Sequence, residues 1–463
     1  MEGEPDGPDR TVDVVVVGSG IAGSMAALSA REAGAGKVLL IEKRAIFGGT
    51  AKLSQGGFAT AVVNAKNNPQ ESLNDWKAWM QDGDSGYPDY DKFLSVAGQA
   101  GDAVEYLRSL GLIIIGQVSG GGNALMTKLE ETITAQNIEV LLGCEAMEIT
   151  LDNGVVSGIA AIYRHRSFRI KAKNVMLATG GFSRNPELVA QWAGTNPGLT
   201  YVVSLADSGS AGDGILMARR IGAALYSNAF TKIAGLQFSA ALRGISAFAQ
   251  PALLSPAPAP LSTQILVNNE AKRIMDEAIG GSFGNVSSYN SGAAYIMIKD
   301  GKPPYYILYD ADSGPAGMMD LTASLEAGAA LGNGEVLKAQ TLNNLAVAMD
   351  VPAGTLKDTV TRYNGFADSE DGDFGKHHSY IKRIETPPFY AVKAYPNSYG
   401  SMGGVVTDSN GRVFDEAGNV IPHLYAVGEV SNRDFYNESY IGGASLALYS
   451  TAGRIAGKAT GGK

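Results

Sequence analysis

The feature that most constrains this chain is a six-residue glycine loop, GSGIAG, at residues 18–23. A nearly unbroken β-branched run, TVDVVVV at 11–17, precedes the loop, as is typical of a strand buried on both faces of a parallel sheet. An alanine-rich helical pattern, SMAALSAREAG, follows and is closed by Gly34, and a second strand, KVLLIEK, ends at Glu42. This order predicts a complete βαβ unit.

The loop also has the spacing of a dinucleotide-binding fingerprint, G-x-G-x-x-G. Gly18 and Gly20 permit a tight turn and the close approach of a pyrophosphate, whose charge the N–H groups at the helix start would meet. Gly23 permits close packing of helix against strand, and Glu42, nineteen residues later, would accept hydrogen bonds from the adenosine ribose. The fingerprint predicts a bound dinucleotide but does not separate NAD from FAD.

The rest of the chain predicts further α/β elements with one interruption. Residues 139–163 have the pattern of strands joined by an Asp-Asn-Gly turn, 168–177 form another strand, and 211–224 form a helix opened by a glycine loop. A proline-rich stretch, PALLSPAPAPLS, then breaks the pattern, which LYAVGEV and a final glycine-opened helix restore. We therefore expect an α/β fold with a discontinuous nucleotide-binding domain, 1–232 and 386–463, and an inserted domain, 233–385.

Composition excludes several other classes of protein. The formal net charge of −9 argues against a nucleic-acid partner. The acidic start lacks the features of a signal peptide and no run of about 18 apolar residues occurs, so we expect a cytoplasmic chain without a membrane segment, a signal removed before Met1 being left open. The single cysteine, Cys144, excludes an internal disulfide, a C-x-x-C-H haem and an iron–sulfur cluster built by this chain alone, and the four histidines lack metal-ligand spacing, so we expect no metal.

Several further motifs decide between the two dinucleotides. In chain order they are GSGIAG, FGGTAKLSQGG, LATGGFSRN, AGDG, VNNEAKRIMDE, TVTRYN, FGK, PPFYAV, SMGGVVTD, LYAVGEV and GGASLAL. Together they resemble the FAD domain and cap of the fumarate reductase and succinate dehydrogenase flavoproteins. The soluble branch with flavocytochrome c fumarate reductase, urocanate reductase and the 3-ketosteroid dehydrogenases is the most similar. The resemblance implies a Rossmann-type FAD-binding domain with an inserted α+β capping domain.

By this resemblance, the FAD contacts come from most parts of the nucleotide-binding domain. The implied residues are Gly18, Ser19, Gly20, Ala22, Gly23, Glu42, Lys43, Gly49, Thr50, Ser54, Gly56, Gly57, Ala146, Ala178, Thr179, Gly180, Asp213, Gly428, Glu429, Ser445 and Leu446. Thr50 matches the histidine that carries the flavin covalently in quinone-linked relatives, so FAD is expected to bind non-covalently. Covalent attachment makes the flavin a better oxidant, so its absence favours the reductive direction.

The chain departs from the family at the residues that clamp and protonate fumarate. The two family histidines fall at Ala234 and Gly400, and the two arginines fall near Gly281 and at Tyr440. Without guanidinium groups a substrate carboxylate would be buried unpaired, which costs several kcal/mol. Fumarate is therefore a poor candidate, and a flat, largely uncharged enone-like or phenolic molecule of steroid, isoflavonoid or phenylpropanoid type is expected.

Three hydroxyl-bearing residues are candidates for proton transfer or carbonyl polarisation: Tyr440, Tyr399 and Ser401. Tyrosines do this proton chemistry in the 3-ketosteroid dehydrogenases. We expect an ene-reductase in which reduced FAD delivers hydride to an activated alkene and a tyrosine protonates the neighbouring carbon. The alternatives are the reverse reaction, a dehydrogenation beside a ketone, and a non-catalytic flavin subunit. In each case electrons pass to or from a separate donor or acceptor.

Overall fold

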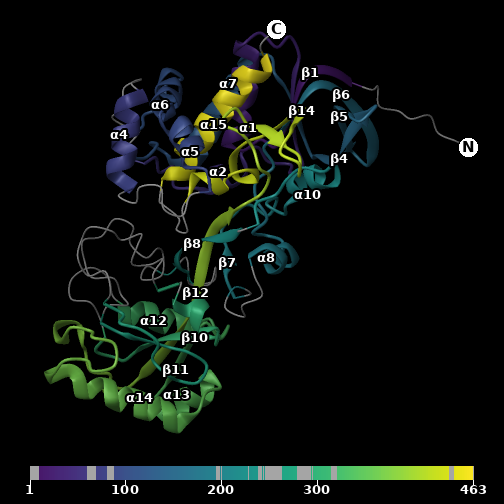
Figure 1. Ribbon diagram of the computed structural model, residues 1–463. Coiled ribbons are helices and arrows are strands. Elements are labelled where there is room, and N and C mark those ends of the chain that lie inside the picture. Colours follow the sequence, from purple (N-terminus) through teal and green to yellow (C-terminus); the bar gives the residue numbers. More distant parts are fainter. Residues whose placement is uncertain are drawn as a thin grey trace, which may run out of the picture. The chain divides into compact units, whose positions relative to one another are not determined.

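The computed structural model describes residues 10–59, 69–80, 88–193, 199, 201–227, 229–237, 242, 245, 263–278, 293–294, 296–313, 321–436 and 443–461. The chain divides into two compact units (Figure 1). The first unit comprises 1–193, 204–232 and 399–463, and the second comprises 194–203 and 233–398.

The first unit is built on a largely parallel sheet. Its strands are β1 (Arg10–Val17), β2 (Val38–Glu42), β3 (Glu139–Leu142), β4 (Cys144–Asp152), β5 (Val155–Tyr163), β6 (Arg166–Leu177), β13 (Arg412–Phe414) and β14 (Val420–Ala426). They follow the order β13-β14-β6-β1-β2-β3, and β5 adds to the early part of β6 with β4 beside it. The pairs β1–β2, β1–β6, β2–β3 and β6–β14 are parallel, as the buried β-branched run at 11–17 predicts.

Helices surround this sheet. Those of the first unit are α1 (Ile21–Glu32), α2 (Gly49–Leu53), α4 (Pro69–Met80), α5 (Tyr90–Ala97), α6 (Ala100–Ser109), α7 (Gly121–Ala135), α8 (Pro186–Ala193), α10 (Asp213–Arg220) and α15 (Ala444–Gly461), with short 3₁₀ turns η4 (Gly428–Val430) and η5 (Arg433–Phe435). Alternate residues of β1 enter two different cores: Val14 and Val16 pack with α1, α7 and α15, whereas Val15 and Val17 pack with β4, β5 and α10. The sheet is thus buried on both faces.

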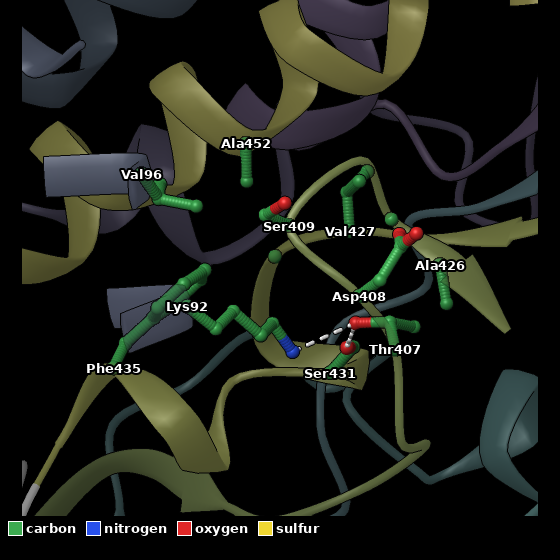
Figure 2. Close-up of a pocket in the computed structure, with 12 residues that line it drawn as sticks. Lys92, Val96, Thr407, Asp408, Ser409, Ala426, Val427, Ser431, Phe435 and Ala452 are labelled. Atoms are coloured by element: carbon green, nitrogen blue, oxygen red, sulfur yellow. Dashed lines mark hydrogen bonds between the residues drawn. The ribbon is translucent and has the colours of Figure 1, made fainter. Parts of the chain in front are cut away.

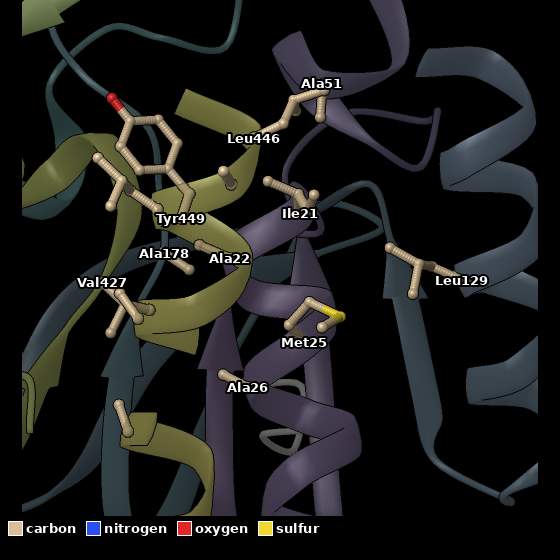
Figure 3. Close-up of a cluster of buried hydrophobic side chains, with 14 of the residues drawn as sticks. Ile21, Ala22, Met25, Ala26, Ala51, Leu129, Ala178, Val427, Leu446 and Tyr449 are labelled. Atoms are coloured by element: carbon tan, nitrogen blue, oxygen red, sulfur yellow. The ribbon is translucent and has the colours of Figure 1, made fainter. Parts of the chain in front are cut away.

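The first helix and the last helix of the chain pack unusually closely (Figure 3). Gly453, Gly457 and Gly461 of α15 face the backbone oxygens of Ala22, Ala26 and Ala30 of α1, which would lie 2.3, 2.3 and 2.4 Å from a Cβ at each glycine. Only glycine permits that approach, since a Cβ at any of the three would overlap main-chain atoms. The small residues noted in the C-terminal sequence therefore bring α15 back onto the βαβ unit.

The second unit is a mixed sheet with helices. Its elements are β9 (Ile265–Val267), β10 (Tyr305–Tyr309), β11 (Val336–Ala339), α12 (Leu321–Ala330), α13 (Leu342–Met349), α14 (Ala353–Gly365), η2 (Phe366–Asp368) and η3 (His378–Tyr380). Strands β7 (Val203–Ser204), β8 (Phe230–Gln237) and β12 (Phe389–Met402) contain residues of both units. The sheet order is β11-β12-β10-β9, and β10 and β11 are antiparallel to β12.

The unit boundaries differ from the expected domain boundaries in two places. The first boundary lies at 232/233, but residues 386–398 belong to the second unit, as do 194–203. The reason is β12, whose residues 389–394 pair with β10 and β11 before the chain enters the first unit. The proline-rich stretch lies outside the described residues. None of the helices in the described part of the chain has the length and apolar character that crossing a bilayer requires.

Candidate functional site

Four parallel strands deliver predicted site residues to one edge of the first sheet. Gly18 follows β1, Glu42 ends β2, Ala178 follows β6, and Gly428 follows β14. Because these strands are neighbours in the order β14-β6-β1-β2 and run parallel, their carboxyl ends lie together. Ligands of open α/β sheets bind in the crevice at this edge.

The three glycines of the loop have different roles. Gly18 has φ +109°, and a Cβ there would lie 2.3 Å from the carbonyl oxygen of Ala178. A Cβ on Gly23 would lie 2.0 Å from the carbonyl oxygen of Gly18. Gly20, by contrast, has an ordinary φ of −62°, and its Cβ would meet no protein atom within 4 Å. The protein backbone therefore requires Gly18 and Gly23, whereas Gly20 borders open space at the start of α1.

Glu42 is held beside this loop. Its carboxylate is buried, with one oxygen accepting from the N–H of Ser19 at 3.0 Å and from the Ser19 hydroxyl at 2.8 Å, and the other accepting from the N–H of Arg44 at 2.8 Å. The Ser19 hydroxyl also accepts from the N–H of Gly48 at 2.9 Å. Glu42 is thus fixed at the carboxyl edge, where a ribose acceptor was expected, and Ser19 connects the loop to the chain after β2.

Other predicted contacts surround the same edge. Lys43 forms an ion pair with Asp213 at the start of α10, so these two predicted residues bind each other. The Thr50 hydroxyl accepts from the N–H of Asp207 at 2.9 Å. The hydroxyl of Thr179, directly after Ala178, is buried and has no hydrogen-bond partner among the described residues. Buried hydroxyl groups usually have a hydrogen-bond partner, which a ligand can also provide.

A second set of predicted residues lies on α2 and on the loop that follows it. These are Gly49, Ser54, Gly56 and Gly57. A Cβ on Gly49 would point toward the Cα of Gly20, 3.8 Å away, and a Cβ on Gly57 would come within 4.0 Å of the Cα of Gly443, just before α15. The structure therefore brings this loop between the glycine loop and the first turn of α15, which contains the predicted Ser445 and Leu446.

Ala146 lies in a different strand from the other predicted residues. It is part of β4, is buried, and packs in the same core as Val17 at the end of β1. Just before β4, the N–H of Gly143 donates to the carbonyl oxygen of Arg44 at 2.9 Å. The start of β4 is therefore next to the segment that follows Glu42, which is compatible with the predicted adenine contact.

Glu429 and Ser401 form one buried cluster. The N–H of Ser401 donates to Glu429 Oε1 at 2.9 Å, and the Ser401 hydroxyl lies 3.3 Å from the same oxygen and accepts from the N–H of Phe182 at 2.9 Å. A Cβ on Gly400 would lie 2.4 Å from Glu429 Oε1, and a Cβ on Gly181 would lie 2.3 Å from it. The Glu429 carboxylate thus fills the space that a side chain at position 400 would need. Ser401 is fully buried within this cluster.

The remaining substrate-side predictions are only partly described. Tyr399 is half-buried in β12. Ala234 lies in β8, and both Tyr440 and the position near Gly281 lie outside the described residues.

The sequence did not predict a network of buried side-chain hydrogen bonds that reaches the start of α15. Asn432 donates to the hydroxyl of Tyr449 at 2.7 Å and to the carbonyl oxygen of Ser401 at 2.8 Å. The hydroxyl of Tyr436 lies 2.7 Å from that of Ser445 and donates to that of Tyr449 at 3.4 Å. Burial raises the pKa of Tyr449, and the charge of Glu429 adds to the shift. The aromatic segment 434–440 was the only sequence signal, and it did not indicate these partners.

Lys92 lines a small pocket that Val427 and Gly428 also line, and there it bonds to Thr407 (Figure 2). Lys92 of α5 donates to Asp434 at 2.5 Å and to the Thr407 hydroxyl at 2.9 Å, and Tyr226 donates to the same Asp434 oxygen. Burial lowers the pKa of Lys92 against the attraction of Asp434, and burial followed by the Asp434 charge raises the pKa of Tyr226. Lys92 therefore connects α5 to η5, in which Asp434 lies. No sequence spacing relates these residues.

Comparison with known proteins identifies the family. The chain matches the FAD binding domain family over residues 13–121 and 114–446. It is 29% identical to a fumarate reductase (cytochrome) of Shewanella frigidimarina, over 97% of this chain and 77% of the relative. It is 27% identical to a vinyl phenol reductase of Lactiplantibacillus plantarum, over 90% of this chain and 89% of the relative. The fold matches that of the 3-ketosteroid Δ1-dehydrogenase of Sterolibacterium denitrificans with a TM-score of 0.75 and 20% identity, over 98% of this chain and 99% of that one.

The chain is a flavoprotein of the FAD binding domain family. More particularly, it is an FAD-dependent oxidoreductase of the class that acts on CH–CH groups, in the branch with flavocytochrome fumarate reductase and the ketosteroid dehydrogenases, as the sequence predicted.

The described residues fit FAD. The open space at Gly20 and the N–H groups at the start of α1 suit a pyrophosphate. Glu42 keeps acceptor capacity for a ribose, since a carboxylate offers about four lone-pair sites. The first N–H groups of α15 have no partner within the helix, and the helix begins beside Gly57, which suits the flavin carbonyl that gains charge on reduction.

Proposed function

We propose that this protein is an FAD-dependent ene-reductase that acts on an uncharged, enone-like or phenolic substrate and not on fumarate. The observation that carries the proposal is the position of Glu429. In the fumarate enzymes a histidine occupies the place of Gly400, and here a carboxylate fills the space that its side chain would need. Position 400 therefore provides no cation-capable side chain to a substrate carboxylate, which disfavours a dianionic substrate.

The relatives support an alkene as the reacting group. A vinyl phenol reductase and a fumarate reductase are both 27–29% identical over at least 90% of this chain. The name of the former refers to a neutral phenolic alkene, the chemistry that a tyrosine-containing site without an arginine pair fits. By the same family resemblance, we assign the second unit as the inserted capping domain, with its boundaries at 194–203 and 233–398.

FAD supplies the hydride when it is bound and reduced. The chain's own residues would then orient the substrate and provide a proton. Tyr440 stands immediately before the Ile-Gly-Gly sequence at 441–443 and is our candidate for the group that protonates the carbon next to the carbonyl or aromatic ring. Tyr399 is the second candidate. We propose that Ser401 positions Glu429, since its buried hydroxyl and N–H both face that carboxylate.

The test is re-oxidation of the reduced enzyme. Anaerobic protein, reduced with a dye, is mixed with α,β-unsaturated ketones, a vinyl phenol or fumarate, and flavin absorbance is followed. We expect re-oxidation by at least one neutral alkene and none by fumarate. Rapid re-oxidation by fumarate would refute the substrate class. No response to any neutral alkene would favour a flavin subunit without its own catalysis, and reduction of the oxidised enzyme by a saturated ketone would favour the dehydrogenase direction.

A further inference from the structure

Hydrogen bonds connect one buried amide and three hydroxyl groups in a continuous chain that ends at the first turn of α15. We call Asn432, Tyr449, Tyr436 and Ser445 the hydroxyl network. Asn432 donates to Tyr449 at 2.7 Å, Tyr436 donates to Tyr449 at 3.4 Å, and Tyr436 lies 2.7 Å from Ser445. The Asn432 side chain is itself fixed at its other end, because its Oδ1 accepts from the N–H of Gly403 at 3.0 Å. The backbone thus holds the Asn432 end of the network in place.

Tyr436 cannot leave this position easily. Its side chain is fully buried in the core that contains α1, α7 and α15. Arg433 donates to the carbonyl oxygen of Tyr436 at 2.6 Å. Two residues before Tyr436, Asp434 is paired with the buried Lys92 at 2.5 Å. Breaking a buried ion pair by removing one partner is costly, so the pair fixes the backbone from which Tyr436 projects.

Ser445 is the point at which the network meets the candidate cofactor site. It is the second residue of α15, it is only half-buried, and Gly443 just before the helix has φ +82°. A helix start carries partial positive charge and free N–H groups, which stabilise a negative charge developing nearby. Reduction of a flavin places such a charge on its pyrimidine ring.

We propose that Tyr436, supported by Tyr449 and Asn432, is a positioning residue that accepts a hydrogen bond from the Ser445 hydroxyl, holds the N–H groups of the first turn of α15 toward the flavin and thereby raises the flavin's midpoint potential. The inference rests on the FAD site of the proposed function, in which Ser445 meets the flavin. Tyr436 acts through Ser445, and its effect should disappear when the Ser445 hydroxyl is absent.

The experiment is a double-mutant cycle on midpoint potential, measured by dye-equilibration titration of the full-length protein with bound FAD. The variants are Tyr436→Phe, Ser445→Ala and the double variant. We expect Tyr436→Phe to make the potential more negative, and we expect no further shift when the same change is added to Ser445→Ala. A tenfold change in the ratio of reduced to oxidised flavin corresponds to about 30 mV for a two-electron couple.

The matched control is Tyr306→Phe in the second unit, which also deletes one buried hydroxyl, bonded at 3.3 Å to the carbonyl oxygen of Met349. It should leave the potential unchanged. Tyr449→Phe provides the same measurement if Tyr436→Phe does not fold. An unchanged potential, or an equal shift with and without the Ser445 hydroxyl, would overturn the inference. Either result would leave the proposed function standing, because that function is judged by re-oxidation with neutral alkenes.

Discussion

At the scale of single residues, Gly20 and Gly23 separate ligand binding from folding. A Cβ on Gly20 would meet no protein atom within 4 Å, whereas a Cβ on Gly23 would lie 2.0 Å from a backbone oxygen. We expect Gly20→Val to keep the melting temperature of the FAD-free protein and to weaken FAD binding by at least about tenfold, or 1.4 kcal/mol. Fluorescence titration with FAD measures the loss. Full FAD affinity in Gly20→Val would show that the open space is not the pyrophosphate site.

Gly23→Ala is the matched comparison for this prediction. Its Cβ would force the glycine loop and α1 apart, which costs about 1–3 kcal/mol of stability in a well-packed interior. The FAD-free protein with Gly23→Ala should therefore melt at a lower temperature than the Gly20→Val protein. Equal melting temperatures for the two variants would contradict the different roles that we assign to the two glycines.

Tyr440 carries the residue-scale prediction on catalysis. Tyr440→Phe deletes one hydroxyl and keeps the ring, so a loss of turnover reports on the proton or hydrogen bond. If the hydroxyl is the acid, kcat should fall by about 10²- to 10⁴-fold while FAD binding is retained. If it only polarises a ground-state carbonyl, KM should rise more than kcat falls. Unchanged kcat and KM with a neutral alkene would remove Tyr440 from the mechanism in favour of Tyr399.

At the scale of elements, the packing of α1 against α15 determines whether the site is assembled. A Cβ on Gly457 would lie 2.3 Å from the backbone oxygen of Ala26. Gly457→Ala should separate the two helices and reduce stability by about 1–3 kcal/mol. It should also weaken FAD binding, since the first turns of α15 and α1 both belong to the proposed site. Thermal unfolding and FAD titration test this.

The control for Gly457→Ala is Gly354→Ala in α14, where a Cβ would meet nothing within 4 Å. This substitution should be neutral or should stabilise the protein by about 0.4–1 kcal/mol, because it only reduces the freedom of the unfolded chain. A Gly457→Ala protein that is as stable as the Gly354→Ala protein would show that the close helix packing is not required.

The sequence predicts correctly those helices and strands whose conformation depends mainly on their own residues. The strand at 10–17, the helix after it and the strand to Glu42 follow from β-branched runs and glycine punctuation, and the structure confirms them. The Glu429–Ser401 cluster could not be predicted in this way. Its partners are 28 residues apart and meet only because β12 and the turn after β14 are brought together in the fold. Lys92 and Asp434 are 342 residues apart, and no local pattern relates them.

At the scale of the whole molecule, the proposed cofactor site consists of segments from both ends of the chain. The glycine loop and β2 come from the first 50 residues, and Glu429 and α15 come from the last 40. The family resemblance could place both ends at FAD because its motifs occur in the same order. It could not reveal Tyr436, Tyr449 and Asn432, because their contribution depends on side-chain hydrogen bonds and burial that only the folded chain defines.

The dependence of this site on distant segments leads to a prediction about the whole protein. Thr50 has no imidazole with which to form a covalent link, so acid precipitation should release all flavin into the supernatant. Flavin in the pellet would contradict non-covalent binding.

Because FAD would bind only the folded chain, added FAD should raise the unfolding free energy, by about 2.7 kcal/mol when free FAD is 100 times its Kd. The melting temperature should therefore rise with FAD concentration in the wild-type protein. It should rise less in Gly20→Val over the same concentrations, because a tenfold or greater loss of affinity limits the stabilisation to about 1.4 kcal/mol where the wild-type protein gains about 2.7 kcal/mol. A constant melting temperature in the wild-type protein would mean that FAD does not join these segments.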